Sequence, residues 1–138
     1  MAATYSSFMT TRFYSPVFNT ALFDGPLRIY FSQSYESVAL KIYHLLQSQH
    51  AEMWDLLKKH TANSKEHLFL MIYPEKNDLH MVFDKSEKLF QAQEWAEGMS
   101  VGVVHPQTDE DIQIQIEFIV KTVESWLGTQ VLLNEAQV

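Results

Sequence analysis

The sequence predicts a single domain of the α+β class, and three observations lead to that prediction. Short apolar runs bounded by turn residues are interspersed with longer segments whose apolar residues recur every three or four positions. All four prolines, Pro16, Pro26, Pro74 and Pro106, lie between these segments, as expected of residues that interrupt helices and strands. With 138 residues, of which 46% are hydrophobic, the chain is long enough to form one apolar core.

The N-terminal part predicts a hairpin followed by a helix. Residues 17–23 (VFNTALF) and 27–33 (LRIYFSQ) have the composition of strands, and Asp24-Gly25-Pro26 between them is a turn sequence. From about residue 35 to residue 60 the apolar positions follow a helical spacing. We therefore expect one amphipathic helix there.

The middle of the chain predicts a second hairpin that is apolar on both faces. The runs HLFLMIY at 67–73 and LHMVFDK at 79–85 flank the polar stretch PEKND. With Tyr73 opposite Leu79, one face carries Phe69, Met71, Tyr73, Leu79, Met81 and Phe83, and we assign it to the core. The other face carries Leu68, Leu70, Ile72 and Val82, with His80 and Asp84. Because such a sheet must be covered on both sides, what covers the second face is the main functional question.

The C-terminal part predicts a short helix, a strand and a longer helix. Residues 86–98 carry a helical apolar stripe, and 100–105 (SVGVVH) have the composition of a strand. Residues 112–118 alternate as a strand would, but the apolar positions from Ile112 to Leu127 form one continuous helical face, so we predict a helix. Thr108 and Asp111 have the spacing of a capping box, and Gly128 is the expected end of this helix.

From residue 27 the first six predicted elements follow the βαββαβ order of the ferredoxin-like fold. The strand at 17–23 adds an N-terminal extension to that sheet, and the last helix follows it. The alternative counts the 17–23 strand in the sheet and omits the short helix, which gives the order ββαβββα. That order is similar to the roadblock and longin class of small scaffolding domains, an analogy of element order alone.

We expect the domain to span residues 17–128, after a partly disordered extension at 1–16 and before a C-terminal tail at 129–138. Ten basic and seventeen acidic residues give a net charge of −7, which repels a phosphate backbone and argues against nucleic-acid binding. The chain has no cysteine, so it offers no thiolate nucleophile or ligand. No signal peptide or run of about eighteen apolar residues is visible. We therefore expect a cytoplasmic protein that does not insert into a membrane.

The sequence contains few groups arranged for chemistry. Its four glycines do not form either of the common phosphate-binding loops, and its six histidines do not have metal-ligand spacing. We therefore predict no catalytic residue, no metal site and no cofactor. His80, which shares its predicted face with Asp84, is the histidine best placed for acid–base or ligand chemistry.

Two functions remain as hypotheses. The first, which we favour, is a non-catalytic adaptor or regulatory module that binds a protein partner or forms a homo-oligomer through apolar surface. Its predicted interface residues are Leu68, Leu70, Ile72, Phe90, Trp95, Ile114 and Trp126. The alternative is a small-ligand-binding or enzymatic domain with a pocket near Tyr30, His80 and His105.

Overall fold

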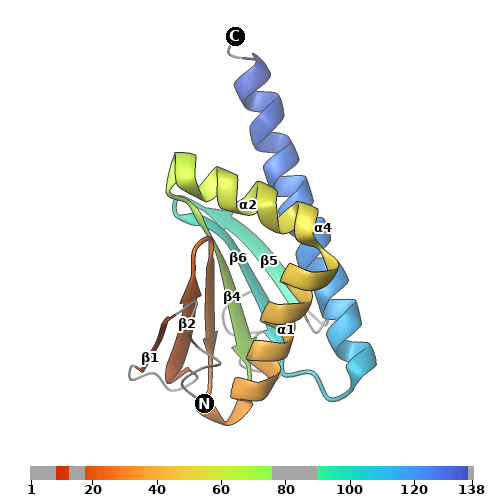
Figure 1. Cartoon of the computed structure of the whole chain (residues 1–138). Helices are drawn as coiled ribbons and strands as arrows, with labels where there is room; N and C mark the ends of the chain where they lie inside the picture. The colour runs from red at the N-terminus through yellow and green to blue at the C-terminus, as the bar shows by residue number, and fades with distance from the viewer. Residues whose placement is uncertain (1–8, 13–17, 76–89, 137–138) are drawn as a thin grey trace.

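The computed structural model describes residues 9–12, 18–75 and 90–136 of the chain. In these residues one mixed β-sheet is covered by helices (Figure 1). The prediction of a mixed helix-and-sheet fold is therefore confirmed. The second strand of the predicted central hairpin, residues 79–85, lies outside the described residues, and so do His80 and Asp84.

Within the described residues the sheet has six strands, in the order β1-β2-β3-β4-β6-β5. Their bounds are β1 Met9–Arg12, β2 Thr20–Asp24, β3 Leu27–Phe31, β4 His67–Tyr73, β5 Phe90–Trp95 and β6 Gly98–Val104. The three central strands β3, β4 and β6 are parallel neighbours, whereas β1, β2 and β5 pair antiparallel to their neighbours. The ferredoxin-like topology is not confirmed.

The helices connect the strands and cover one face of the sheet. A short 3-10 helix, η2 (Gln33–Tyr35), leads into α1 (Glu36–Gln49), which is followed by α2 (Ala51–Ser64). The last element described is α4 (Asp109–Ala136). Together α1 and α2 form the crossover that parallel strands β3 and β4 require. The predicted single helix at 35–60 is thus two helices, because His50 (φ −132°, ψ 50°) leaves the helical conformation between them.

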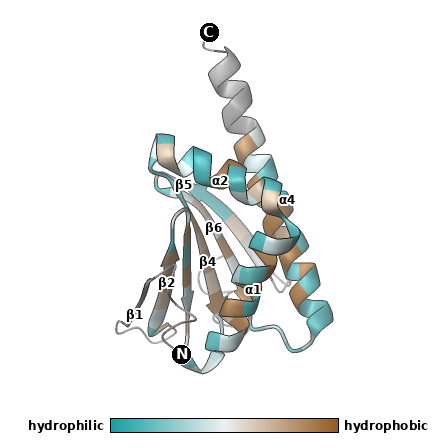
Figure 2. Cartoon of the chain, in the orientation of Figure 1, coloured by the Kyte–Doolittle hydropathy of each residue, from teal (hydrophilic) through white to brown (hydrophobic). Residues whose placement is uncertain are grey.

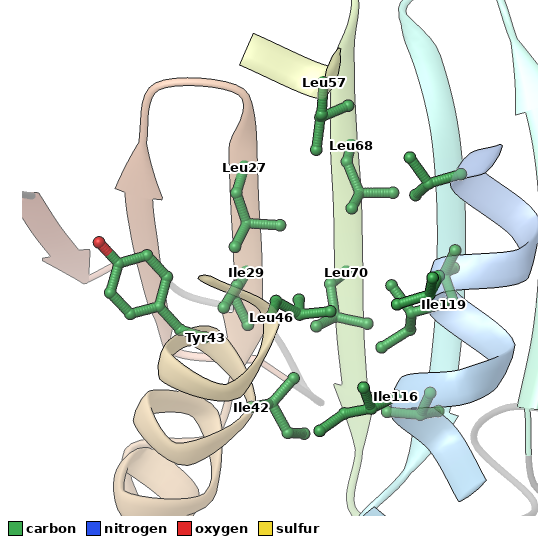
Figure 3. Packing of buried hydrophobic residues seen from close by; sticks show 14 of the residues in the cluster. Leu27, Ile29, Ile42, Tyr43, Leu46, Leu57, Leu68, Leu70, Ile116 and Ile119 are labelled. Carbon is green, nitrogen blue, oxygen red and sulfur yellow. The ribbon is translucent and has the colours of Figure 1, made fainter. Parts of the chain in front are cut away.

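One face of the three parallel strands forms the core beneath the helices. Alternate residues of these strands are buried there: Leu27, Ile29 and Phe31 of β3, Leu68, Leu70 and Ile72 of β4, and Met99, Val101 and Val103 of β6. Ile42 and Leu46 of α1, Leu57 of α2, and Ile116 and Ile119 of α4 pack onto them (Figure 3). Hydrophobic residues are accordingly frequent in the strands, and the helices carry both hydrophobic and hydrophilic residues (Figure 2).

This core corrects the predicted assignment of the two faces of β4. Leu68, Leu70 and Ile72 are fully buried under helices of the same chain, so they are not available as an interface. Phe69 and Met71, which we assigned to the core, are half-buried on the opposite face. The helices cover the aliphatic face because Ile29 and Val101, which are opposite Leu70 in the neighbouring strands, extend the same surface.

The predicted helix at 86–98 is wrong for the residues that the structure describes. Residues 90–95 form strand β5, which pairs with β6 in the register Trp95↔Gly98 to Phe90↔Val103. A tight turn joins the two strands, and Gly98 follows it with φ +137°. A Cβ at Gly98 would lie 2.0 Å from the carbonyl oxygen of His67, so the close approach of β6 to β4 requires glycine here.

Helix α4 confirms the helical prediction for residues 112–118 and begins as predicted. The backbone N–H of Asp111 donates to Oγ1 of Thr108 at 3.1 Å, and the backbone N–H of Thr108 donates to Oδ2 of Asp111 at 3.2 Å. This is a capping box with aspartate in place of glutamate. The predicted end at Gly128 is wrong, because α4 continues to Ala136. A glycine inside a helix costs only about 1 kcal/mol, which does not force the helix to stop.

The two glycines give a matched test of this fold. Gly98→Ala should destabilise the protein by about 3 kcal/mol or more, because the new methyl group meets the His67 backbone at a positive φ. Gly128→Ala should instead stabilise it by roughly 0.5–1 kcal/mol, because Gly128 is helical with open space around it. Urea denaturation of both variants measures the difference, and equal effects would contradict the described turn.

Candidate functional site

The carboxyl ends of β3, β4 and β6 meet at one edge of the sheet, where ligands bind in many parallel sheets. At this edge the ring of His105 packs on the ring of Tyr35, with 3.9 Å between the centroids. The side-chain amide of Gln107 lies 3.2 Å from Nδ1 of His105. Burial lowers the pKa of His105, which favours the neutral imidazole over the charged one.

Beside this edge, an open groove of about 480 Å³ lies between α1 and the start of α4. Lys41 of α1 and Asp109 of α4 form an ion pair of 2.6 Å across it, and both side chains are well exposed. The pKa of Asp109 is lowered, chiefly by its hydrogen bond from Lys41. A second carboxylate near the start of α4, that of Asp111, caps the helix. These contacts join α1 to the start of α4, and we propose no reaction or ligand for this groove.

The face of the sheet that the helices leave uncovered, which includes Phe69 and Met71 of β4, carries a row of aromatic side chains. Tyr30 of β3 stacks on Phe69 of β4, with ring centroids 6.5 Å apart and an interplanar angle of 13°. Phe23 packs edge-on against Tyr30 at 6.2 Å, and Phe18 packs against Tyr73 at 5.0 Å. This face is therefore apolar, as the sequence predicts, but it differs from the helix-covered face in being aromatic rather than aliphatic.

A polar pair lies at one end of this aromatic row. Nη2 of Arg28 lies 3.2 Å from Nε2 of His67, and the guanidinium also lies over the Phe23 ring, 4.8 Å from its centroid. Because arginine has only donors, Nε2 of His67 accepts this hydrogen bond, so the imidazole is neutral and carries its proton on Nδ1. Burial and, to a smaller extent, the charge of Arg28 lower the pKa of His67.

The structure separates two of the predicted pocket residues. Tyr30 contacts Phe18, Phe23 and Phe69 on the aromatic face, whereas His105 packs on Tyr35 at the carboxyl edge. Burial raises the pKa of Tyr30, although the charge of Arg28 opposes this shift. Because His80 lies outside the described residues, a pocket that includes it stays a prediction.

The predicted interface residues have different positions in the fold. Trp126 is only 3% exposed and belongs to the core beside His60, which corrects its assignment to an interface. Ile114 is 46% exposed on α4, and Leu56, which the sequence analysis did not single out, is 55% exposed on α2. Phe90 and Trp95 begin and end β5, the last strand of the sheet. Their interface role, like that of Ile114, stays a prediction.

Two kinds of feature are absent from the residues that the structure describes. No group of three or more histidine, aspartate or glutamate side chains in this part of the chain could hold a metal ion. None of the helices described is both long and apolar enough to cross a bilayer. Comparisons with protein-family models, with curated proteins and with solved structures found no match to this chain.

Sequence reasoning missed the pairing of Arg28 with His67. The two residues are 39 positions apart, and nothing in either segment alone indicates contact. The pairing of β3 with β4 in the register Arg28↔Phe69 brings them together. The sequence contained one indication of this site. The alternating pattern of LRIYF places Arg28 and Tyr30 on the same face of the strand.

The Arg28–His67 pair predicts a pH dependence of stability. Because the folded pKa of His67 is below its ordinary value of 6.5, the unfolded chain takes up a proton first as the pH falls. The free energy of unfolding should therefore decrease as the pH falls from about 6.5 through the folded pKa. NMR titration of the His67 ring measures that pKa, which should move toward its ordinary value in Arg28→Gln. A His67 pKa at or above 6.5 in the unmutated protein would contradict the described pair.

Proposed function

We propose that this chain is a non-catalytic interaction module that associates with a second copy of itself, and that the end of α4 makes the contact. The observation that carries the proposal is the length of α4. Its 28 residues span about 42 Å, whereas the longest strands have seven residues and span about 23 Å. The C-terminal turns of α4 therefore extend beyond α2 and the sheet (Figure 1).

The side chains that the structure describes on α4 reach the core as far as Leu127. Trp126 and Leu127 are the last side chains of α4 in the described core, and residues 129–136, here called the projecting segment, continue as helix. Most helical stability in proteins comes from tertiary packing of an apolar face, so a helix end that extends beyond the sheet is stabilised when a partner packs on it. The projecting segment contains Val131, Leu132 and Leu133 in its sequence, which suits packing against a partner.

Two further observations support an interaction module. Ile114 and Leu56 are large apolar side chains exposed on two helices that contact each other, α4 and α2. From Thr20 onward, the described elements follow the order strand, strand, helical arm, three strands, helix, with α1 and α2 counted as one arm. Small scaffolding domains of the roadblock and longin class share this order, although element order is an analogy and does not carry function.

Sizing with light scattering tests the proposal. The unmutated chain should have the mass of a dimer or a larger assembly at high micromolar concentration. Combining Leu132→Glu with Leu133→Glu should weaken association at least about tenfold, because each buried leucine contributes roughly 1.5–3 kcal/mol. The melting temperature of the dissociated variant should no longer depend on protein concentration.

A matched control changes the net charge equally at other exposed positions. Gln113→Glu with Ala62→Glu places one new carboxylate near the start of α4 and one near the end of α2, and this pair should leave the oligomeric mass unchanged. A strictly monomeric mass for the unmutated chain would contradict the proposal. So would unchanged association of the double leucine variant.

A further inference from the structure

A second groove, here called the edge groove, lies between the β5–β6 hairpin and α4 and has a volume of about 510 Å³. Met99, Phe118 and Trp126 provide its apolar surface, and Glu94, Lys121 and Thr122 provide its polar groups. Small-molecule sites in proteins have volumes of about 300–1,000 Å³ and combine an apolar lining with a few polar groups. The edge groove meets both conditions.

The fold holds the walls of the edge groove in place. Glu94 and Met99 are opposite each other in the antiparallel β5–β6 ladder, so the hairpin sets their spacing. Met99 and Trp126 are 8% and 3% exposed, and the Trp126 ring packs against His60 with 5.0 Å between centroids. The apolar surface is therefore part of the core and does not need to be assembled when a ligand binds.

Nε1 of Trp126 is itself buried, so Trp126 offers the edge groove ring surface and no accessible hydrogen-bond donor. The polar contacts of a ligand therefore come from the other side chains of the groove.

The two charged residues of the edge groove are opposite in sign. Glu94 and Lys121 are both exposed, and among the described residues neither takes part in the Lys41–Asp109 ion pair or in the contact of His60 with Glu66. A purely anionic ligand would face Glu94 and the net charge of −7, whereas a purely cationic one would face Lys121. A ligand that carries both charges avoids both conflicts.

We propose that the edge groove binds a small zwitterion with a large apolar side chain, such as a free hydrophobic amino acid or a short hydrophobic peptide. Its ammonium group pairs with Glu94, its carboxylate pairs with Lys121 and accepts from the hydroxyl of Thr122, and its side chain packs on Met99, Phe118 and Trp126. The edge groove uses residues of α4 that precede the projecting segment, so this proposal does not depend on self-association.

Calorimetric titration of the full chain with L-phenylalanine and with the dipeptide Phe-Phe tests the proposal and separates its two sources. At least one of the two compounds should bind saturably. The compound with the higher affinity shows whether the edge groove fits an amino acid or a peptide. N-acetyl-phenylalanine and phenylalanine amide, which each lack one of the two charges, should bind roughly tenfold or more weakly than phenylalanine. If neither zwitterion binds saturably up to about 10 mM, the proposal is overturned.

Two variants test whether Glu94 and Lys121 bind the two charged groups of the ligand. Glu94→Gln should weaken binding of the preferred zwitterion roughly tenfold, with no further loss for the N-acetylated ligand, and Lys121→Gln should behave likewise toward the amide. Glu52→Gln and Lys59→Gln make the same changes at exposed positions of α2 and should leave affinity unchanged. Equal losses in the control variants, or no loss in the groove variants, would overturn the assignment.

Discussion

The burial of one aliphatic face of β4 under the chain's own helices is the constraint on which the rest of the structure depends. Leu68, Leu70 and Ile72 lie in the middle of a layer that continues into β3 on one side and β6 on the other. Fully burying such side chains contributes roughly 1.5–3 kcal/mol each. The parallel pairing of β3 and β4 requires a crossover connection, and α1 and α2, which form it, cover this face.

The same constraint determines which surfaces remain for function. Once α1, α2 and α4 cover the aliphatic face, the aromatic face with the Arg28–His67 pair, the β5 edge and the outer side of α4 are the surfaces with distinctive chemistry. The edge groove lies where the helix layer ends beside β5. Its apolar residues come partly from the sheet and partly from α4. The packing of α4 on the sheet therefore determines the shape of the proposed binding surface.

Local patterns were enough to predict part of this fold. The strand at 67–73 and the capping box of Thr108 and Asp111 were predicted because each depends on neighbouring residues only. Which face of β4 the helices cover could not be predicted, because both of its faces are apolar and the answer depends on pairing with Ile29 and Val101. The helical stripe at 86–98 was misleading for a similar reason: Gly98 serves a hairpin turn packed against His67, and this contact is not visible in sequence. Of the candidate sites, Arg28–His67 and Glu94–Lys121 were missed because each joins segments that are far apart in the chain.

The most direct test of this account is the effect of Leu70→Ala on both stability and oligomeric mass. Leu70 is fully buried at the centre of the intrachain core, so the variant should lose about 2–5 kcal/mol of unfolding free energy. Its folded form should keep the oligomeric mass of the unmutated chain. A loss of association with unchanged stability of the monomer would contradict the account, because it would mean that this face of β4 contacts another chain instead of its own helices.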